Sequence, residues 1–233
     1  MRWGGALALL VLAQACASPV SPPPATVAPA PTVVPTQPPP PPTPVPTLKP
    51  IVQEPRTPTG EYFLGRSDAP VTFDMFGDFQ CPACGEFART IEPTFIQTYV
   101  NTGKVKYVWH DYAWIGDESD TAAQAGRCAG RQGQFWAYHD YLYAHQRGEN
   151  VGQFSSANLQ AFAVSIGLDP EAFGICMDLE PDMQAVHDAL RFGLTKGIDV
   201  TPSFLINGEL KVGAPPMNRL AALLEFYLAR SSH

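Results

Sequence analysis

Two features are scarce in this chain of 233 residues: clusters of basic side chains and long apolar runs. No run of lysine or arginine occurs, and the formal net charge is −7. A nucleic-acid partner is therefore not expected, because binding to phosphates requires a basic face. The long apolar run Gly4–Ala13 is confined to the N-terminus and is too short to cross a bilayer. We expect the folded part of the chain to be soluble.

Residues for a metal centre or a hydrolytic triad are also few. His139 and His145 are six positions apart, which is not the i, i+4 spacing of a helical metal-binding pair. These two, with His110 and His187, are interpreted as partly buried structural residues. Ser155–Ser156 is interpreted as a helix cap, since no Ser-His-Asp arrangement is recognisable.

Two further groups of residues are given structural rather than catalytic interpretations. Aromatic side chains are expected to pack in the core of a helical segment: Phe135, Trp136, Tyr138, Tyr141 and Tyr143. Acidic side chains in the same part of the chain are expected on the solvated surface: Glu118, Asp120 and Glu149.

Residues 1–17 are typical of an export signal. Arg2 supplies a positive charge, and a short apolar stretch follows it. Two interpretations of its end remain open. Ala15-Cys16-Ala17 fits cleavage by an ordinary signal peptidase. Alternatively, Cys16 is a lipidated first residue, preceded by an imperfect lipobox, and it would anchor the chain to a membrane.

Residues 18–58 are predicted to be a disordered, proline-rich tether. Positions 19–58 hold 17 of the 25 prolines and almost no charge. Such a composition favours extended polyproline II, with a rise of about 3.1 Å per residue. The segment is either a spacer that lifts a domain off a surface or a leader without a role. Residues 59–233 are long enough for one domain with its own core.

The pattern after residue 59 predicts strand, helix, strand, several helices, a hairpin and a last helix. We expect strands at 71–76 and 104–110, separated by a helix over 81–100. A helical stretch follows over about 117–196, with caps at Ser155 and Asp169. Asn207-Gly208 predicts a tight turn between strands 202–206 and 209–212, and 217–229 predicts a helix. This order favours a mixed sheet, because a helical crossover joins parallel strands and a hairpin joins antiparallel ones.

Cys81-Pro82-Ala83-Cys84 is the motif that carries chemistry. It lies at the predicted start of a helix, directly after a strand. The unpaired N–H groups and the dipole at a helix N-terminus stabilise an anion there, which lowers the pKa of the first thiol. The second cysteine lies one turn further on, close enough to form a disulfide. Pro82 suits the first helical position, where its missing N–H is not needed.

Other interpretations of this Cys-x-x-Cys are less favoured. Half of a zinc site would need a second ligand pair, whereas Cys128 and Cys176 stand 48 positions apart. A purely structural disulfide is disfavoured by the position at a strand-to-helix junction. Without Cys16 the cysteine count is four, an even number that suits an oxidising compartment.

Four segments resemble motifs of the DsbA family of thioredoxin-fold proteins, in family order: Ala69–Val71, Asp78–Cys84, Gly133–Trp136 and Val200–Gly208. The resemblance spans about residues 60–230. It implies an α/β, thioredoxin-like fold with a central mixed β-sheet flanked by helices. It also implies an inserted all-helical subdomain at about 112–196.

The resemblance further implies roles for individual residues. Cys81 would be the nucleophile and Cys84 the resolving cysteine of a redox-active disulfide. Thr201–Pro202 would be a cis peptide facing this pair, where the backbone before Pro202 binds an extended substrate. The expected substrate-binding residues are Pro82, Ala83, Val200, Thr201 and Pro202. Cys128 and Cys176 would form a structural disulfide; a second redox centre is the alternative.

Three positions depart from the best-known members of that family. Ala83 replaces a histidine that stabilises the thiolate, which predicts a weaker oxidant. Met75 replaces a buried acid, so a proton acceptor for Cys84 would have to be supplied otherwise; Asp74 and Asp78 are the nearest candidates. Asp78 is also interpreted as a loop or helix-end residue. Thr201 before the proline is shared with isomerases and reductases.

The sequence therefore predicts an exported, monomeric oxidoreductase that introduces disulfides into extracytoplasmic proteins through Cys81-Pro82-Ala83-Cys84 and needs no cofactor and no metal. Its expected partners are reduced extracytoplasmic proteins and a membrane protein that re-oxidises Cys81–Cys84. The N-terminus would supply the only contact with the membrane. Two alternatives remain: a disulfide isomerase or reductase on the same fold, and a non-catalytic, tethered peptide-binding module. A free secreted protein is the alternative to membrane anchoring.

Overall fold

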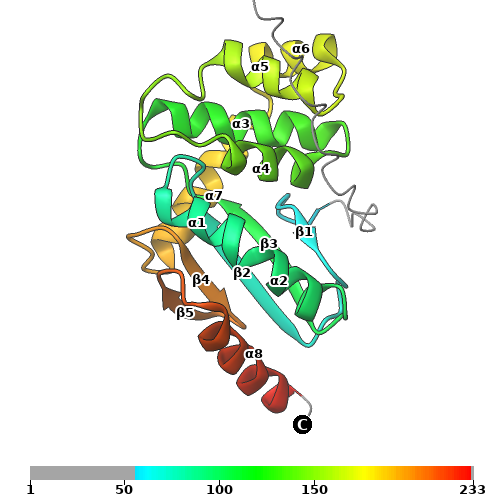
Figure 1. The fold of residues 1–233 in the computed structure, drawn as a ribbon, viewed down its shortest axis with the longest axis vertical. Coiled ribbons are helices and arrows are strands. Elements are labelled where there is room, and N and C mark those ends of the chain that lie inside the picture. Colours follow the sequence, from blue (N-terminus) through cyan, green and yellow to red (C-terminus); the bar gives the residue numbers. More distant parts are fainter. Residues whose placement is uncertain (1–55, 232–233) are drawn as a thin grey trace, which may run out of the picture. The chain divides into compact units, whose positions relative to one another are not determined.

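The structure, a computed structural model, describes residues 56–231 (Figure 1). The export signal, Cys16 and the proline-rich segment up to residue 55 lie outside the described residues. The interpretations given above for those residues therefore remain predictions.

The described part of the chain is built on a five-stranded sheet of order β1-β3-β2-β4-β5. Its strands are β1 (Phe63–Leu64), β2 (Val71–Gly77), β3 (Val105–Asp111), β4 (Ser203–Ile206) and β5 (Glu209–Val212). β2 and β3 are parallel, while the other neighbours are antiparallel. The predicted mixed sheet is confirmed. The sequence did not predict β1, since two residues are too short to show an alternating pattern.

The β4–β5 hairpin turns at the predicted dipeptide. Asn207 and Gly208 both have positive φ, at 47° and 85°. This is the conformation that a two-residue hairpin requires and that Asn-Gly adopts readily. The Asn207 side chain also accepts a hydrogen bond of 2.8 Å from the backbone N–H of Thr72, which ties the turn to β2.

The helix predicted over 81–100 is three consecutive elements. They are α1 (Pro82–Thr90), α2 (Glu92–Phe95) and the π-helical η1 (Ile96–Val100). The expectation of one continuous helix was wrong because Pro93 falls inside it. Proline has no N–H to donate, and its ring clashes with the carbonyl four residues earlier. The chain therefore breaks at Ile91 and restarts with Pro93 in the first turn of α2.

Five helices lie between β3 and β4: α3 (Asp117–Arg131), α4 (Phe135–Ala144), α5 (Ser156–Ser165), α6 (Pro170–Leu179) and α7 (Met183–Thr195). Figure 1 shows α3 to α6 gathered beyond one end of the sheet. Asp169 caps α6 as predicted, accepting from the N–H groups of Glu171 and Ala172. Ser155 occupies the N-cap of α5 without a side-chain hydrogen bond. The last helix, α8 (Met217–Ser231), follows the hairpin.

Successive side chains of β2 point to opposite faces of the sheet, and each face is packed against helices. Phe73 contacts Phe95 and Phe204 in the large core that also contains Phe87 of α1 and Leu224 of α8.

On the other face of the sheet, Phe76 packs with Tyr112, Ile198 and Leu205, and it contacts Phe192 of α7. α7 therefore covers the face opposite α1 and α8, and β2 is held firmly up to the point where the Cys-x-x-Cys segment begins.

A buried ion pair joins the sheet to the helices. The Arg127 Nε atom of α3 donates to Oδ2 of Asp111 at the end of β3 over 2.7 Å. Both side chains are almost inaccessible, at 2% and 1% exposure. The indole of Trp109 donates to the other Asp111 oxygen over 2.8 Å. Asp111 is therefore satisfied on both oxygens and fixes where β3 meets α3.

Several polar residues are more buried than expected. Glu118 is half-buried, because its carboxylate accepts from the N–H groups of Gly152 and Phe154. Asp120 is half-buried beside His187. His139 is fully buried among aromatic rings rather than partly buried. Glu149 is exposed, as expected.

Candidate active site

The loop between β2 and α1 is organised by the carboxylate of Asp78. One oxygen accepts from the backbone N–H of Gln80 and the hydroxyl of Ser119, both over 2.8 Å. The other oxygen accepts from the N–H groups of Trp114 and Ile115, over 3.0 and 3.1 Å. Burial raises the pKa of Asp78, and these hydrogen bonds act against that rise. Asp78 is a loop residue, as the sequence suggested, and it joins the Cys-x-x-Cys segment to the β3–α3 loop.

Two side chains from the helical segment hold the same loop from the other side. Gln146 donates to the carbonyls of Phe79 and Cys81, over 2.8 and 2.9 Å. The Tyr143 hydroxyl donates to the Asp78 carbonyl over 3.1 Å. Sequence reasoning missed Gln146, because its partners lie 65 or more residues earlier in the chain and leave no local pattern. The position of Cys81 is therefore set by the helices as well as by the sheet.

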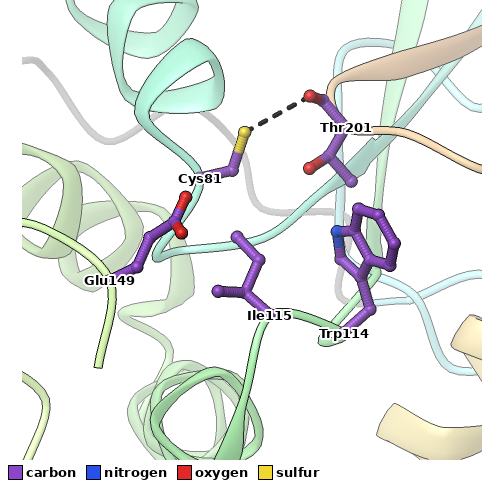
Figure 2. A pocket seen from close by; sticks show the side chains of 5 residues that line it. All are labelled: Cys81, Trp114, Ile115, Glu149 and Thr201. Atoms are coloured by element: carbon purple, nitrogen blue, oxygen red, sulfur yellow. Dashed lines mark hydrogen bonds between the residues drawn. The ribbon is translucent and has the colours of Figure 1, made fainter.

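Cys81 occupies the N-cap of α1, with Pro82 in the first turn. The backbone N–H of Cys84 donates to Sγ of Cys81 over 3.4 Å. On its other side, Sγ of Cys81 lies 3.3 Å from the backbone carbonyl oxygen of Thr201, to which the protonated thiol donates (Figure 2). Both cysteines are free thiols, so the structure represents the reduced pair.

The pKa of Cys81 is lowered from 9.0 to about 6. The largest cause is a hydrogen bond from the Cys84 side chain, which stabilises the thiolate. Burial acts in the opposite direction, and Thr201 with the N–H groups at the start of α1 lowers the pKa further. At pH 7 roughly nine-tenths of such a thiol is ionised, so the attacking species is the prevailing one.

Cys84 has the opposite character. Its side chain is fully buried, and burial raises its pKa well above 9.0, with Cys81 as the next cause. It therefore stays a thiol that can donate to Cys81. Of the two cysteine residues, Cys81 is 5% exposed and Cys84 is 0% exposed.

The two carboxylates considered as proton acceptors for Cys84 are both engaged elsewhere. Asp74 accepts from Nε2 of His110 over 2.9 Å, if that nitrogen carries the proton. The Asp78 carboxylate binds the four groups described above, and only its backbone approaches Cys84. At the position of the family acid, Met75 instead accepts from the Tyr107 hydroxyl at its sulfur over 3.0 Å. Neither carboxylate hydrogen-bonds Cys84.

The peptide bond Thr201–Pro202 is cis, and it faces the thiol pair. A cavity of about 410 Å³ opens beside it, lined by Cys81, Trp114, Ile115, Glu149 and Thr201 (Figure 2). Pro82 and Ala83 are exposed on the neighbouring turn of α1, and Val200 is 39% exposed. The family resemblance predicted that Thr201 lies beside Cys81, and the two residues are in contact in the structure. Trp114 and Ile115 were missed, and Glu149 was expected only as surface.

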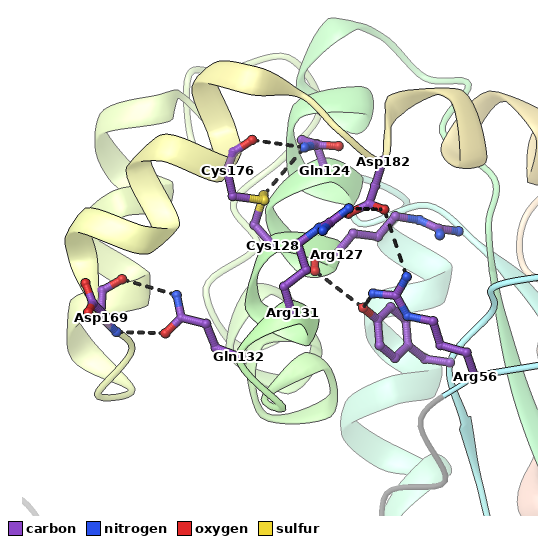
Figure 3. Close-up of a disulfide and its surroundings, with 10 residues drawn as sticks. Arg56, Gln124, Arg127, Cys128, Arg131, Gln132, Asp169, Cys176 and Asp182 are labelled. Atoms are coloured by element: carbon purple, nitrogen blue, oxygen red, sulfur yellow. Dashed lines mark hydrogen bonds and ion pairs between the residues drawn. A yellow bond between two sulfur atoms is a disulfide. The ribbon is translucent and has the colours of Figure 1, made fainter.

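Cys128 of α3 and Cys176 of α6 form a disulfide with an S–S distance of 2.04 Å (Figure 3). Gln124 donates to the Cys176 carbonyl over 3.4 Å beside it. Cys128 and Cys176 are 1% and 9% exposed, so the disulfide lies among the buried residues.

One group of described residues has a composition suited to a metal ion. Ligand atoms of Glu92, His139 and Asp140 lie within 4.8 Å of one another. Neither oxygen of the Glu92 carboxylate has a hydrogen-bond partner, and burial raises its pKa to about 7. This group shares no residue with the lining of the cavity at Cys81.

Comparison with known proteins identifies the family. The family model described as thioredoxin matches residues 57–225. The crystal structure of oxidised BdbD from Bacillus subtilis superposes with a TM-score of 0.69 at 25% identity, covering 77% of this chain and 98% of that one.

Two relatives match the chain over stretches of different length. A probable disulfide bond formation protein D from Bacillus anthracis is 40% identical over 86 residues, which are 36% of this chain and 40% of that protein. A Na(+)/H(+) antiporter NhaA 1 from Salinispora arenicola is 31% identical over 177 residues, which are 72% of this chain and 25% of the antiporter. The chain thus spans well under half the length of these two relatives. Within residues 56–231, no helix is both long enough and apolar enough to cross a bilayer.

The expectations of a thioredoxin-like fold and of DsbA-family membership are both confirmed by these matches. The chain belongs to the thioredoxin family and has a DsbA-like fold, with its own Cys-x-x-Cys pair at the start of α1.

Proposed function

We propose that this protein is an exported thiol-disulfide oxidoreductase that introduces disulfides into extracytoplasmic proteins through Cys81-Pro82-Ala83-Cys84. The observation that carries the proposal is the contrast between the two thiols. Cys81 borders an open cavity and has a pKa lowered to about 6, while Cys84 is buried with a raised pKa. A stabilised thiolate favours the reduced pair, which makes the corresponding disulfide a better oxidant.

In the first step, a substrate thiolate attacks Sγ of Cys81 in the oxidised protein. A substrate–Cys81 disulfide forms, the Cys81–Cys84 bond breaks, and Cys84 leaves with the electron pair. The high pKa of Cys84 means that it then takes up a proton. Attack at Cys81 is supported by exposure, because Cys84 is inaccessible.

In the second step, another thiolate of the substrate attacks the substrate sulfur of the mixed disulfide. The substrate gains its own disulfide and loses two electrons, and Cys81 leaves as a thiolate. A leaving thiol of low pKa departs faster. Sγ of Cys81 is already 3.3 Å from the Thr201 carbonyl, so a substrate strand that pairs with this backbone would bring its cysteine beside Cys81.

The proposed location and partners follow from the same chemistry. An oxidising compartment is supported by the Cys128–Cys176 disulfide and by the signal-like residues 1–17. The reduced pair must give its two electrons to another redox protein before the next cycle. We propose that this partner lies in the membrane and that the protein acts as a monomer.

The equilibrium reduction potential of Cys81–Cys84, measured against glutathione, tests the direction of the reaction. We expect a value above about −200 mV, whereas a value near −270 mV, that of thioredoxin, would indicate a reductase. Refolding assays with reduced and with scrambled substrates distinguish an oxidase from an isomerase. Faster rescue of a reduced substrate than of a scrambled one supports the oxidase, and the reverse order indicates an isomerase. A Cys81→Ser variant that keeps its biological function would indicate a peptide-binding module instead.

A further inference from the structure

The cavity at Cys81 has walls of different chemistry, contributed by four separate segments. Thr201 comes from the cis-proline loop and Cys81 from the start of α1. Trp114 and Ile115 come from the β3–α3 loop, and Glu149 comes from the loop after α4 (Figure 2). A side chain that enters this space must therefore satisfy an apolar wall, a carboxylate and the reactive sulfur together.

Trp114 is 51% exposed, which is unusual for so large an apolar side chain. It is held in place rather than loose, because its backbone N–H donates to Asp78 over 3.0 Å and its ring lies 6.2 Å from that of Tyr112. An exposed, fixed indole face is a surface on which a cation can stack.

Glu149 is the ionisable wall residue besides the thiol itself. Its carboxylate forms no ion pair and no hydrogen bond with a described residue, in contrast to Glu118 of the same region. Its loop is nevertheless anchored, since the N–H of the next residue, Asn150, donates to the Gln80 side chain. The carboxylate is thus free to pair with an incoming group while its backbone stays in place.

The loops that meet at the cavity contain the acids Asp78, Glu149 and Asp199 and the bases Arg147 and Lys196. Asp78 is buried and bound to backbone N–H groups, so Glu149 is the carboxylate on the cavity wall. A carboxylate, an aromatic face and an apolar floor suit the aliphatic stem and charged head of lysine or arginine. An acidic side chain would meet the Glu149 carboxylate, which repels it.

We propose that this cavity selects substrates that carry lysine or arginine within one or two residues of the reacting cysteine, through Glu149 and Trp114. The inference rests on the proposed function, because it assigns the substrate class of the same site. The cation would stack on Trp114 and pair with Glu149 while the neighbouring substrate sulfur reaches Cys81.

The test uses the full, oxidised chain and a set of reduced peptides with one cysteine each. The peptides differ only in the residue next to the cysteine: arginine, norleucine or glutamate. The second-order rate of mixed-disulfide formation is followed by acid quenching and mass spectrometry. Because neighbouring charges change the reactivity of the peptide thiol itself, each rate is divided by the rate of the same peptide with a small aromatic disulfide.

Two variants accompany the wild type. Glu149→Gln removes the wall charge with little change in volume. Glu86→Gln removes one charge from an exposed position of α1 that does not line the cavity, and it serves as the matched control. We expect the wild type to react at least about five-fold faster with the arginine peptide than with the glutamate peptide. The ratio should fall towards one in Glu149→Gln and persist in Glu86→Gln.

Each other outcome overturns the inference in a recognisable way. Equal normalised rates in the wild type, or a maximum for norleucine, would mean that the cavity does not select cations. A ratio that persists in Glu149→Gln, or that falls equally in Glu86→Gln, would remove Glu149 from the explanation. These results leave the proposed function standing, whereas failure of all three peptides to open the Cys81–Cys84 bond would remove the proposed function itself.

Discussion

The backbone N–H of Cys84 donates to Sγ of Cys81 across 3.4 Å, and the pKa values of the two thiols are displaced in opposite directions. One turn of helix therefore places an anionic sulfur on the cavity wall and a protonated sulfur beneath it. Reduction of the disulfide creates both of these stabilised forms at once, whereas the disulfide has neither.

This arrangement predicts that the reduced protein gains stability over the oxidised protein as the pH rises from about 6 to 9. The pKa of Cys81 is lower in the folded protein than in the unfolded chain, where it is near 9.0. Its contribution to the free energy of unfolding of the reduced protein is therefore complete above pH 9 and is lost as the pH falls through about 6. The raised pKa of Cys84 changes the free energy of unfolding only above about pH 9. The difference should grow by about 2–3 kcal/mol once solvent screening is allowed for.

Urea unfolding of both redox forms at several pH values measures this difference. The oxidised form is the control, because neither thiol can titrate in it. A difference between the two forms that stays constant from pH 6 to 9 would contradict the assignment of the low pKa to the folded state.

Local signals predicted the elements that build the site. Alternation of apolar residues predicted β2, and the Asn207-Gly208 turn predicted the β4–β5 hairpin. The position of Pro82 after a cysteine predicted the start of α1. In each case the residues that specify the structure are adjacent in the sequence, so the pattern is visible without the fold.

Contacts between distant parts of the chain could not be predicted in this way. Gln146 reaches the Cys81 carbonyl across 65 positions, and Asp78 reaches the Trp114 N–H across 36. The cavity depends on the same long-range packing, which is why Glu149 could be interpreted only as a surface charge. The prediction that Glu149 is exposed was correct. Its position on the cavity wall beside Cys81 could be recognised only from the fold.

Replacement of Ala83 by histidine should make the protein a stronger oxidant. Ala83 is exposed next to Cys81, and its backbone N–H already helps to lower the pKa of that thiol. An imidazolium at position 83 would lower the pKa of Cys81 by about one further pH unit, which corresponds to an increase of roughly 30 mV in the reduction potential of the Cys81–Cys84 pair. Glutathione equilibration of Ala83→His beside Ala83→Gln measures the effect. Equal potentials in the two variants would show that charge at this position does not reach the thiolate.

The double variant Cys128→Ser/Cys176→Ser should lose stability without losing exchange activity. The disulfide closes a loop with a sequence separation of 48, worth about 3–4 kcal/mol in the chain-entropy model. Denaturant unfolding gives the first quantity, and the rate of peptide oxidation under conditions where the fold persists gives the second. A large loss of rate in the folded variant would favour an electron-relay role for this pair.

Breaking the buried pair between Asp111 and Arg127 should destabilise the fold by about 3–5 kcal/mol, because it leaves one charge buried alone. Asp111→Asn is the single variant to measure. The double variant Asp111→Leu/Arg127→Met removes both charges and should recover much of that loss. If the single and double variants were equally unstable in urea, packing rather than charge would dominate this contact.

The pH dependence of Cys81 alkylation tests the central claim most directly. The reduced, folded protein is treated with iodoacetamide between pH 4 and 10, and the modified residue is identified by mass spectrometry. The account predicts modification at Cys81, with a rate that rises through a midpoint near pH 6, while Cys84 stays unmodified. A midpoint close to 8.5, the value of an ordinary thiol, would contradict it.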